Sequence, residues 1–340
     1  MTLAVGVDIG GTKVAAGLVD EDGTVLRTAQ RPTPGRDVRA VEDTVVEVVE
    51  ALVAEAAASG LGPVGAVGVG AAGFVDARSG TVLFSPHLAW RREPLRDAVQ
   101  ARLGRPVLVD NDANGAAWAE WRFGAARGED RVVCITLGTG IGGAIVVDGR
   151  LERGRHGLAG EFGHMVLVPG GHRCECGGRG CWEQYASGNA LGREGRELAR
   201  SGSPVAHELL RRAGGDAEAV LGPLVTAAAQ DGDPASRELL EEMGAWFGLG
   251  LANLAAALDP GTFVVGGGLS AAGELLLGPA REALERSLTG RGYRPAPRLV
   301  AVALGPGAGV VGMADLARTS ATSGVGAVGA HGTTDEEVQR

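Results

Sequence analysis

Four residues in one short stretch have the types and spacing of a metal site. Cys174, Cys176 and Cys181 lie close together, and His164 stands ten positions before the first of them. Sulfur and imidazole ligands suit tetrahedral Zn²⁺, and the intervening glycines let the backbone fold around a small sphere. Three sulfurs and one nitrogen fill four positions and leave none for an activated water. The stretch therefore predicts a structural zinc.

Other interpretations of this stretch stay open. A disulfide is disfavoured because Cys174 and Cys176 are too close to bridge comfortably and the sequence shows no secretory signal. His156 or His172 could replace His164 as a ligand, and His164 could instead be a satisfied core histidine. If His164 binds zinc through one ring nitrogen, its other nitrogen is oriented and can reach a ligand. The same stretch offers three polar groups that could face a ligand, which are Glu161, His164 and Glu183.

A second group of polar residues follows a strand predicted over Val107–Val109. It reads Asp110, Asn111, Asp112, Ala113 and Asn114. A helix is predicted next, over Gly115–Arg122, and α/β folds place ligands where a strand's carboxyl end opens onto a helix. Asp112 can accept a proton from a hydroxyl, and Asn111 can donate and accept. A helix N-cap needs only one Asp or Asn, so four polar side chains here predict a functional turn.

Two glycine–threonine turns each join a pair of predicted strands. The first lies between Leu3–Ile9 and Val14–Val19, and the second lies between Arg131–Thr136 and Ala144–Val147. Glycines allow a phosphate to approach the backbone closely, and Asp8 could orient a magnesium-bound water. A lone turn of this kind could be a simple hairpin, and no Walker motif is present. Two such turns facing each other across a cleft would clamp the phosphates of a nucleotide. The residues concerned are Gly10, Gly11, Thr12 and Lys13 in the first turn, and Gly138, Thr139 and Gly140 in the second.

The other elements must position these groups. A strand is predicted over Thr262–Val265, and three glycines follow it, which are Gly266, Gly267 and Gly268. Because glycine has no side chain, a flat ring can lie on the backbone there. A helix over Ala235–Leu258 carries an apolar stripe that is typical of a core. Further predicted elements are a helix over Arg39–Ala58, a strand over Val64–Val69, a strand over Thr81–Phe84, a loop over Ser85–Trp90, helices over Pro94–Leu103, Ala190–Ser201, Pro204–Arg212, Ala217–Gln230 and Glu274–Leu288, a strand over Arg298–Leu304 and a helix over Gly309–Ala317.

Length and composition restrict the class of protein. The 340 residues suggest two domains, and 45 % hydrophobic residues can fill sizeable cores. A net charge of −9 argues against nucleic acid and against an anionic membrane as partners. The N-terminus has no basic region and only a short apolar run, so a cytoplasmic location is expected.

Four motifs together resemble one family. The segments Asp8–Lys13 and Gly138–Gly143 are similar to its two phosphate motifs, and Val264–Ser270 is similar to its adenosine motif. The cysteine stretch, spaced from His164 as expected, resembles its zinc signature. By these motifs the chain resembles the ROK sugar kinases, within them the actinobacterial-type glucokinases, over about Val5–Ala317.

The resemblance implies a fold and a domain organisation. The fold is α/β, of the actin/hexokinase-like (ribonuclease H-like) ATPase type, with two domains and a ligand cleft between them. The small domain would comprise residues 1–117 and be completed by a helix over 309–317. The large domain would comprise residues 118–308, and residues 318–340 would form a disordered tail.

The resemblance also implies an activity, which is ATP-dependent phosphorylation of D-glucose at its 6-hydroxyl. Asp112 matches the catalytic base. The sugar-binding positions are Gly73, Asn111, Asp112, Glu161, His164 and Glu183. Mg²⁺ would accompany ATP, zinc would be structural, and the chain would form a homodimer or homotetramer. One departure is His87, which stands where family members often have Asn.

Three other functions are alternatives. The family includes sugar-responsive repressors, but these carry a DNA-binding domain before the first phosphate motif, and here Asp8 comes early in an acidic chain. A polyphosphate donor would favour a basic groove. The acceptor could be another hexose, such as mannose, fructose or an N-acetylated amino sugar.

Overall fold

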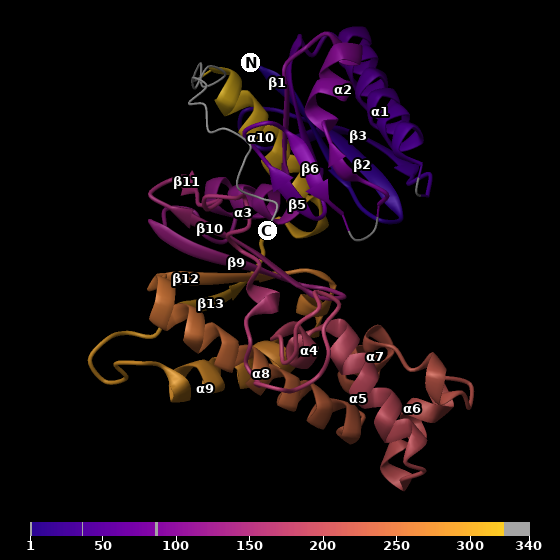
Figure 1. Ribbon diagram of the computed structural model, residues 1–340, viewed down its shortest axis with the longest axis vertical. Coiled ribbons are helices and arrows are strands. Elements are labelled where there is room, and N and C mark those ends of the chain that lie inside the picture. Colours follow the sequence, from indigo (N-terminus) through magenta and orange to yellow (C-terminus); the bar gives the residue numbers. More distant parts are fainter. Residues whose placement is uncertain (1, 36, 86–87, 323–340) are drawn as a thin grey trace, which may run out of the picture.

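The computed structural model describes residues 2–35, 37–85 and 88–322, and two five-stranded sheets of the same topology organise it (Figure 1). The first sheet has the order β3 (Val25–Pro32), β2 (Lys13–Val19), β1 (Leu3–Ile9), β4 (Val64–Ala71) and β8 (Val107–Asn111). The second has the order β11 (Arg150–Leu151), β10 (Ile141–Val147), β9 (Arg131–Leu137), β12 (Thr262–Gly266) and β13 (Arg298–Ala301). In each sheet three antiparallel strands are followed by two parallel ones. The two predicted glycine–threonine turns are thus equivalent positions of a repeated unit.

Apolar strands form the centre of the first sheet because helices cover both of its faces. Alternate valines of β1 and β4 share a core cluster with residues of α1 (Val38–Ala58) and α2 (Leu95–Leu103). Asp37 caps α1 by accepting a hydrogen bond from the Ala40 N–H at 3.1 Å. The helices predicted over 39–58 and 94–103 are therefore confirmed to within one residue.

The other face of this sheet is covered by α10 (Ala308–Thr322), which also packs on α3 (Asp112–Arg122) (Figure 1). Glycines permit a very close approach. A Cβ on Gly68 of β4 would lie 1.9 Å from the backbone oxygen of Met313, and a Cβ on Gly312 would lie 1.7 Å from a backbone oxygen of α3. Any side chain there would push the backbones apart, so the last helix belongs to the first sheet although the sequence places it at the far end.

The disordered tail predicted to begin at Arg318 is wrong for residues 318–322, which continue α10. Arg318 is buried, donates to the Asp20 backbone oxygen at 2.6 Å and forms an ion pair with Asp315. These bonds anchor the end of the helix to the turn before β3, which composition alone does not reveal. Residues 323–340 lie outside the described part of the chain.

A small antiparallel sheet extends from the first one beside its carboxyl-terminal edge. It consists of β5 (Phe74–Asp76), β6 (Thr81–Phe84) and β7 (Arg91–Glu93). Only β6 was predicted, because β5 and β7 are three residues long and lack a clear alternating pattern. Residues 86–87, and with them the departure at His87, lie outside the described residues.

Helices cover the lower face of the second sheet (Figure 1). They are α4 (Glu183–Ala186), α5 (Gly188–Arg200), α6 (His207–Arg212), α7 (Gly222–Gln230), α8 (Pro234–Leu258) and α9 (Glu274–Ser287). The apolar stripe of α8 is core as predicted, since Leu240, Phe247 and Leu251 are fully buried. Trp246 is the exception at 37 % exposed, although its backbone oxygen accepts a hydrogen bond from Trp182 Nε1 at 3.1 Å.

Three predicted elements differ in their bounds or form from the observed ones. The helix predicted over 204–212 starts as a 3₁₀ turn over Pro204–Ala206, and the one over 217–230 is interrupted before Gly222, where an extended residue precedes a proline in the first turn. The strand predicted over 298–304 stops at Ala301. The chain leaves the sheet there because the backbone N–H groups of the next segment bond to the buried Glu120 carboxylate, at 3.0 and 2.9 Å.

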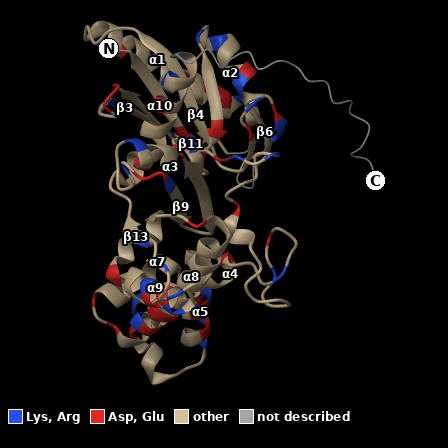
Figure 2. Cartoon of the chain, turned by 90° about the vertical axis from the view of Figure 1, so that its left-hand side faces the viewer, with Lys and Arg blue, Asp and Glu red and all other residues tan. Residues whose placement is uncertain are grey.

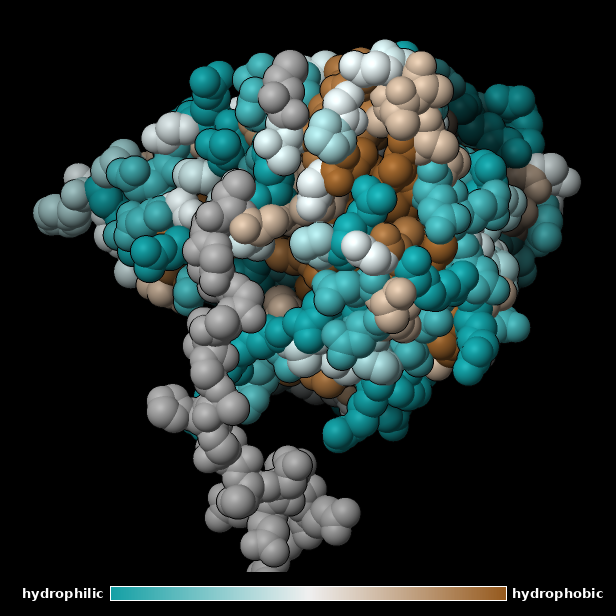
Figure 3. Space-filling view, turned by 90° about the horizontal axis from the view of Figure 1, so that it is seen from above, coloured by the Kyte–Doolittle hydropathy of each residue, from teal (hydrophilic) through white to brown (hydrophobic). Residues whose placement is uncertain are grey.

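The surface is polar and of mixed charge. Residues of both charges are interspersed over the region of α5 and α9 (Figure 2). In the view from above, hydrophobic residues appear mainly as a band between hydrophilic ones (Figure 3). Within the described ranges, none of the helices has the length and apolar character required to cross a bilayer.

Candidate functional site

The first glycine–threonine turn is a tightly closed hairpin between β1 and β2. The Gly10 N–H donates to the Lys13 backbone oxygen at 3.0 Å, and the Thr33 hydroxyl donates to the Gly10 oxygen at 2.7 Å. Gly11, Thr12 and Lys13 remain exposed at its tip. The turn therefore presents backbone N–H groups and an ammonium group to solvent, as phosphate binding requires.

The second turn, between β9 and β10, is also closed by a backbone hydrogen bond and receives support from a helix. The Gly138 N–H donates to the Gly140 oxygen at 3.0 Å. The first residues of α5 donate in turn to this loop, Gly188 to the Gly138 oxygen at 2.8 Å and Asn189 to the Thr139 oxygen at 3.3 Å. The amino-terminal end of α5 thus fixes the shape of the second turn.

The predicted glycine triplet lies against the end of β9. Gly267 has φ +86°, and a Cβ on it would lie 2.3 Å from the Leu137 backbone oxygen. Only glycine satisfies both conditions. The triplet is therefore adjacent to the second turn, which is where a base would lie if that turn held the phosphates of the same nucleotide.

The polar turn after β8 begins α3 three residues earlier than predicted. Asn111 is its N-cap, because its side-chain oxygen accepts from the N–H groups of Ala113 at 2.9 Å and Asn114 at 3.3 Å. Its amide nitrogen donates to the Gly73 oxygen at 3.0 Å. Asn111 thus has the capping role that was the alternative to a functional turn. This cap places Asp112 in the first turn of a helix, where the helix dipole favours a carboxylate.

Asp112 is one of three carboxylates that influence each other. Burial, followed by the charge of Asp112, raises the pKa of Asp8 from 3.8 to about 6, and Lys13 opposes the shift. Burial raises the pKa of Glu161, His164 lowers it, and the charge of Asp112 raises it further. The structure thus brings carboxylates from β1, α3 and the segment before His164 to one place, where a cation or a ligand rich in hydroxyl donors would relieve their repulsion.

The predicted metal ligands converge. One nitrogen of His164 and the sulfurs of Cys174, Cys176 and Cys181, here termed the His–Cys cluster, all lie within 4.8 Å of one another. Nδ1 of His164 is 3.6 Å from the Cys174 sulfur, and the sulfurs of Cys176 and Cys181 are also 3.6 Å apart. A tetrahedron with ~2.3 Å zinc–sulfur bonds has edges of ~3.8 Å, so the donor set fits Zn²⁺.

The thiol chemistry of the His–Cys cluster also suits a cation. Burial raises the pKa of the Cys174 and Cys181 thiols, whereas a backbone hydrogen bond from Gly178 lowers the pKa of Cys176. Three thiols side by side cannot all ionise without a positive charge between them, and a bound divalent cation supplies it. The alternative ligands His156 and His172 are not part of this cluster.

Glu183 connects the His–Cys cluster to the second turn. One of its oxygens accepts from the Cys174 thiol at 3.0 Å, and the other would lie 2.7 Å from a Cβ on Gly140. On the opposite side of the imidazole ring, Nε2 of His164 is 3.9 Å from Glu161. The histidine thus faces the sulfurs with one nitrogen and a carboxylate with the other, as predicted for a ligand that also orients a binding group.

One contact of the site was absent from the sequence-based predictions. Arg153, from the segment after β11, forms an ion pair with the buried Asp110, which directly precedes Asn111. Asp110 belongs to the predicted polar turn, but Arg153 lies in an unremarkable arginine- and glycine-rich segment. The sequence contains no signal that would join the two.

Comparisons with known proteins agree on one family. A family model described as "ROK family" matches residues 4–320. The glucokinase of Streptomyces coelicolor is 46 % identical over 318 residues, covering 94 % of this chain and 98 % of the relative. The crystal structure of a ROK family glucokinase from Streptomyces griseus in complex with glucose and AMPPNP superposes with a TM-score of 0.81 at 49 % identity, covering 93 % of this chain and 99 % of that one.

The family also contains regulators. The crystal structure of a ROK family transcriptional regulator, a homologue of the E. coli MLC protein, has a TM-score of 0.84 at 27 % identity and covers 95 % of this chain and 79 % of its own. Shared folding therefore does not separate kinase from regulator, and the site must do so. With its two phosphate-type turns, its glycine triplet and its His–Cys cluster, the chain belongs to the ROK family and has the actin/hexokinase-like fold of the ROK glucokinases.

Proposed function

We propose that this protein is a glucokinase, which transfers the γ-phosphoryl group of ATP to the 6-hydroxyl of D-glucose. The observation that carries the proposal is the position of Asp112. Its carboxylate lies at the start of α3, within electrostatic reach of Asp8 beside the first phosphate-type turn and of Glu161 beside the His–Cys cluster. A proton acceptor between a phosphate site and a polar site is the arrangement that phosphoryl transfer to a hydroxyl needs.

In this proposal Asp112 is the general base. A primary hydroxyl becomes acidic only as it attacks phosphorus, and a carboxylate in hydrogen-bond reach accepts the proton late, which contributes roughly 10²–10⁴-fold to the rate. The glucose hydroxyls would bind the other polar groups of the site. These are Gly73, Asn111, Glu161, His164 and Glu183.

The donor nucleotide would lie across both turns. Its phosphates would bind Gly10, Gly11, Thr12, Lys13, Gly138, Thr139 and Gly140, and its adenosine would lie on Gly266, Gly267 and Gly268. Mg²⁺, which accompanies ATP in kinases, would neutralise charge on the phosphate oxygens, and Asp8 is the carboxylate placed to orient its bound water.

The His–Cys cluster would hold one structural zinc. Its four donors fill a tetrahedral shell, so the metal would shape the loop that presents His164 and Glu183 and would take no part in the chemistry. Removing it would release both sugar-binding groups together.

Further parts of the proposal concern organisation. The two sheets would be the centres of two domains, over residues 1–117 with α10 and over 118–308, which close over glucose and exclude water. We also propose a homodimer or homotetramer, because α8 presents the partly exposed Trp246. A cytoplasmic location is also proposed, because the proposed donor is ATP and thiol ligands stay reduced in that compartment.

A coupled assay of ADP release tests the activity. Glucose, mannose, fructose and N-acetylated amino sugars would be compared as acceptors, with ATP and polyphosphate as donors. We expect ATP and glucose to give the highest kcat/KM. A preferred amino sugar or polyphosphate would replace the proposed substrate.

Two variants test the roles of the carboxylates. Asp112→Asn keeps the size and most hydrogen bonding but removes the proton acceptor, so kcat should fall by roughly 10²-fold or more with a smaller change in glucose affinity. Glu161→Gln should weaken glucose binding more than kcat. Near-normal kcat in Asp112→Asn would show that another carboxylate, Glu161 or Glu183, is the base.

A further inference from the structure

The carboxylate of Asp110 supports the proposed catalytic turn, and it accepts four hydrogen bonds. Asp110 is 1 % exposed at the end of β8. Its Oδ1 accepts from the Asn111 N–H and from Asn114 Nδ2, both at 2.8 Å. Its Oδ2 accepts from Nε of Arg153 at 2.8 Å and from a terminal nitrogen of Arg153 at 2.6 Å. One oxygen therefore orders the turn that carries Asp112, and the other binds a segment attached to the second sheet.

That segment leads to the other half of the proposed sugar site. Arg153 follows β11, and the chain continues from it through Gly157 to Glu161. On the way it touches β5 closely, since a Cβ on Gly157 would lie 2.5 Å from the Val75 backbone oxygen. Arg153 thus links the segment with Glu161 to Asp110, which lies 43 residues earlier in the sequence.

The geometry of this pair suits positioning. The side chain of Asp110 is 1 % exposed and that of Arg153 is 32 % exposed, so Arg153 supplies an opposite charge to a carboxylate that water does not reach. A guanidinium that donates two bonds to one oxygen fixes both distance and orientation. Without Arg153 the buried carboxylate of Asp110 would accept hydrogen bonds from neutral donors only, which is strongly unfavourable for a buried charge. Asp110 and the turn that carries Asp112 would then move toward water.

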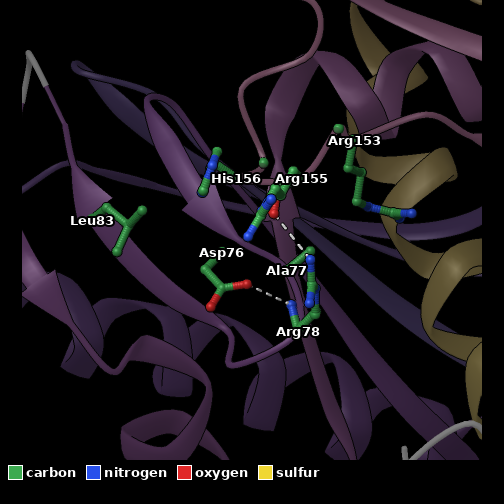
Figure 4. A pocket seen from close by; sticks show the side chains of 9 residues that line it. Asp76, Ala77, Arg78, Leu83, Arg153, Arg155 and His156 are labelled. Carbon is green, nitrogen blue, oxygen red and sulfur yellow. Dashed lines mark hydrogen bonds between the residues drawn. The ribbon is translucent and has the colours of Figure 1, made fainter. Parts of the chain in front are cut away.

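A cavity beside Arg153 allows this role to be tested by substitution. Its stem lines a cavity of about 270 Å³ between the β5–β6 hairpin and residues 153–157. In Figure 4 Arg153 lies at the edge of this cavity and its guanidinium points away from Asp76, Leu83 and His156. A replacement at position 153 therefore meets open space and does not overpack a core.

We propose that the Arg153–Asp110 pair sets the position of Asp112 relative to the sugar-binding groups of the opposite half, so that Arg153 is a positioning residue for the proton transfer. The inference rests on the proposed role of Asp112 as the base. Small displacements of a reacting group are costly in rate, about 10²-fold for about 1 Å. The effect of Arg153 should therefore appear in kcat.

The test is a double-mutant cycle on kcat. Arg153→Met removes the pair, Arg153→Lys keeps the charge without the fork, and each is measured alone and combined with Asp112→Asn. We expect Arg153→Met to lower kcat about tenfold or more with little change in KM for ATP, and Arg153→Lys to recover part of the loss. In the Asp112→Asn background the same change should lower kcat less than about twofold, because no base remains to be positioned.

The outcomes separate this inference from the proposed function. A purely structural role would lower kcat by the same factor in both backgrounds, and that result, or a folded Arg153→Met with normal kcat, would overturn the inference. Normal kcat in Asp112→Asn alone would instead refute the base. If Arg153→Met does not fold, Arg153→Lys decides, since full activity would show that the fork is not needed. Arg150→Gln is the matched control: Arg150 lies on β11, is exposed and forms no side-chain bond to any residue that the structure describes, so kcat should not change.

Discussion

In the absence of nucleotide and magnesium, Asp8 should destabilise the protein at neutral pH, because its buried carboxylate is placed for that ligand. Burial and the neighbouring Asp112 raise its pKa from 3.8 to about 6 in the folded state. The folded protein therefore holds this proton more tightly than the unfolded chain does, so stability falls as pH rises between these two values. At 1.36 kcal/mol per pH unit, ionised Asp8 lowers the free energy of unfolding by about 3 kcal/mol above pH 6.

Asp8→Asn removes the buried charge and should stabilise the protein in the absence of nucleotide and magnesium. At pH 8 the gain should approach about 3 kcal/mol, or about 4 °C in Tm for a chain of this length, and it should fall to about 0.5 kcal/mol near pH 4, where Asp8 is protonated in the folded protein and about half ionised in the unfolded chain. Kinase activity should be lost in the same variant, since the carboxylate is proposed to orient the magnesium water.

Calorimetry of both proteins from pH 4 to pH 8 is the assay. Asp22→Asn is the matched control: Asp22 is exposed in the turn before β3, and its replacement should change stability by less than about 0.5 kcal/mol at any pH. An Asp8→Asn variant that is no more stable than the wild type at pH 8 would refute the reasoning. So would a gain that is the same at pH 4 as at pH 8, because it could not come from ionisation.

Two further predictions concern the metal and the assembly. Elemental analysis of the purified protein should find about one zinc per chain, and active protein without zinc would contradict the metal assignment. Cys176→Ser should lower Tm and activity together. The control Glu175→Gln, which replaces an exposed neighbour, should change neither. Light scattering at assay concentration should give a mass at least twice the 34.4 kDa of one chain. Trp246→Ala should shift this mass toward that of the monomer. A monomeric wild-type protein would refute the proposed oligomer.

Local features could be predicted from the sequence because their physics is local. Cys174, Cys176 and Cys181 lie in a glycine-rich loop whose ligands must converge on any small ion, and the structure confirms that they and His164 do. The glycine–threonine turns were equally predictable, since each joins two strands that are adjacent in the chain. The repeat of the strand–turn–strand unit could also be inferred, because both halves of the sequence start with the same pattern.

The parts that the sequence did not predict depend on contacts between distant segments. Arg318 looks like the start of a polar tail, but its bonds to Asp20 and Asp315 make it the buried end of α10. Nothing near Arg153 identifies Asp110 as its partner, because an ion pair across two sheets has no sequence period. The sequence by itself identified the side chains that are proposed to bind zinc, phosphate and a sugar hydroxyl. Only the tertiary structure brought Asp8, Asp112 and Glu161 near one another, because their burial and mutual charge arise only when these distant segments fold together.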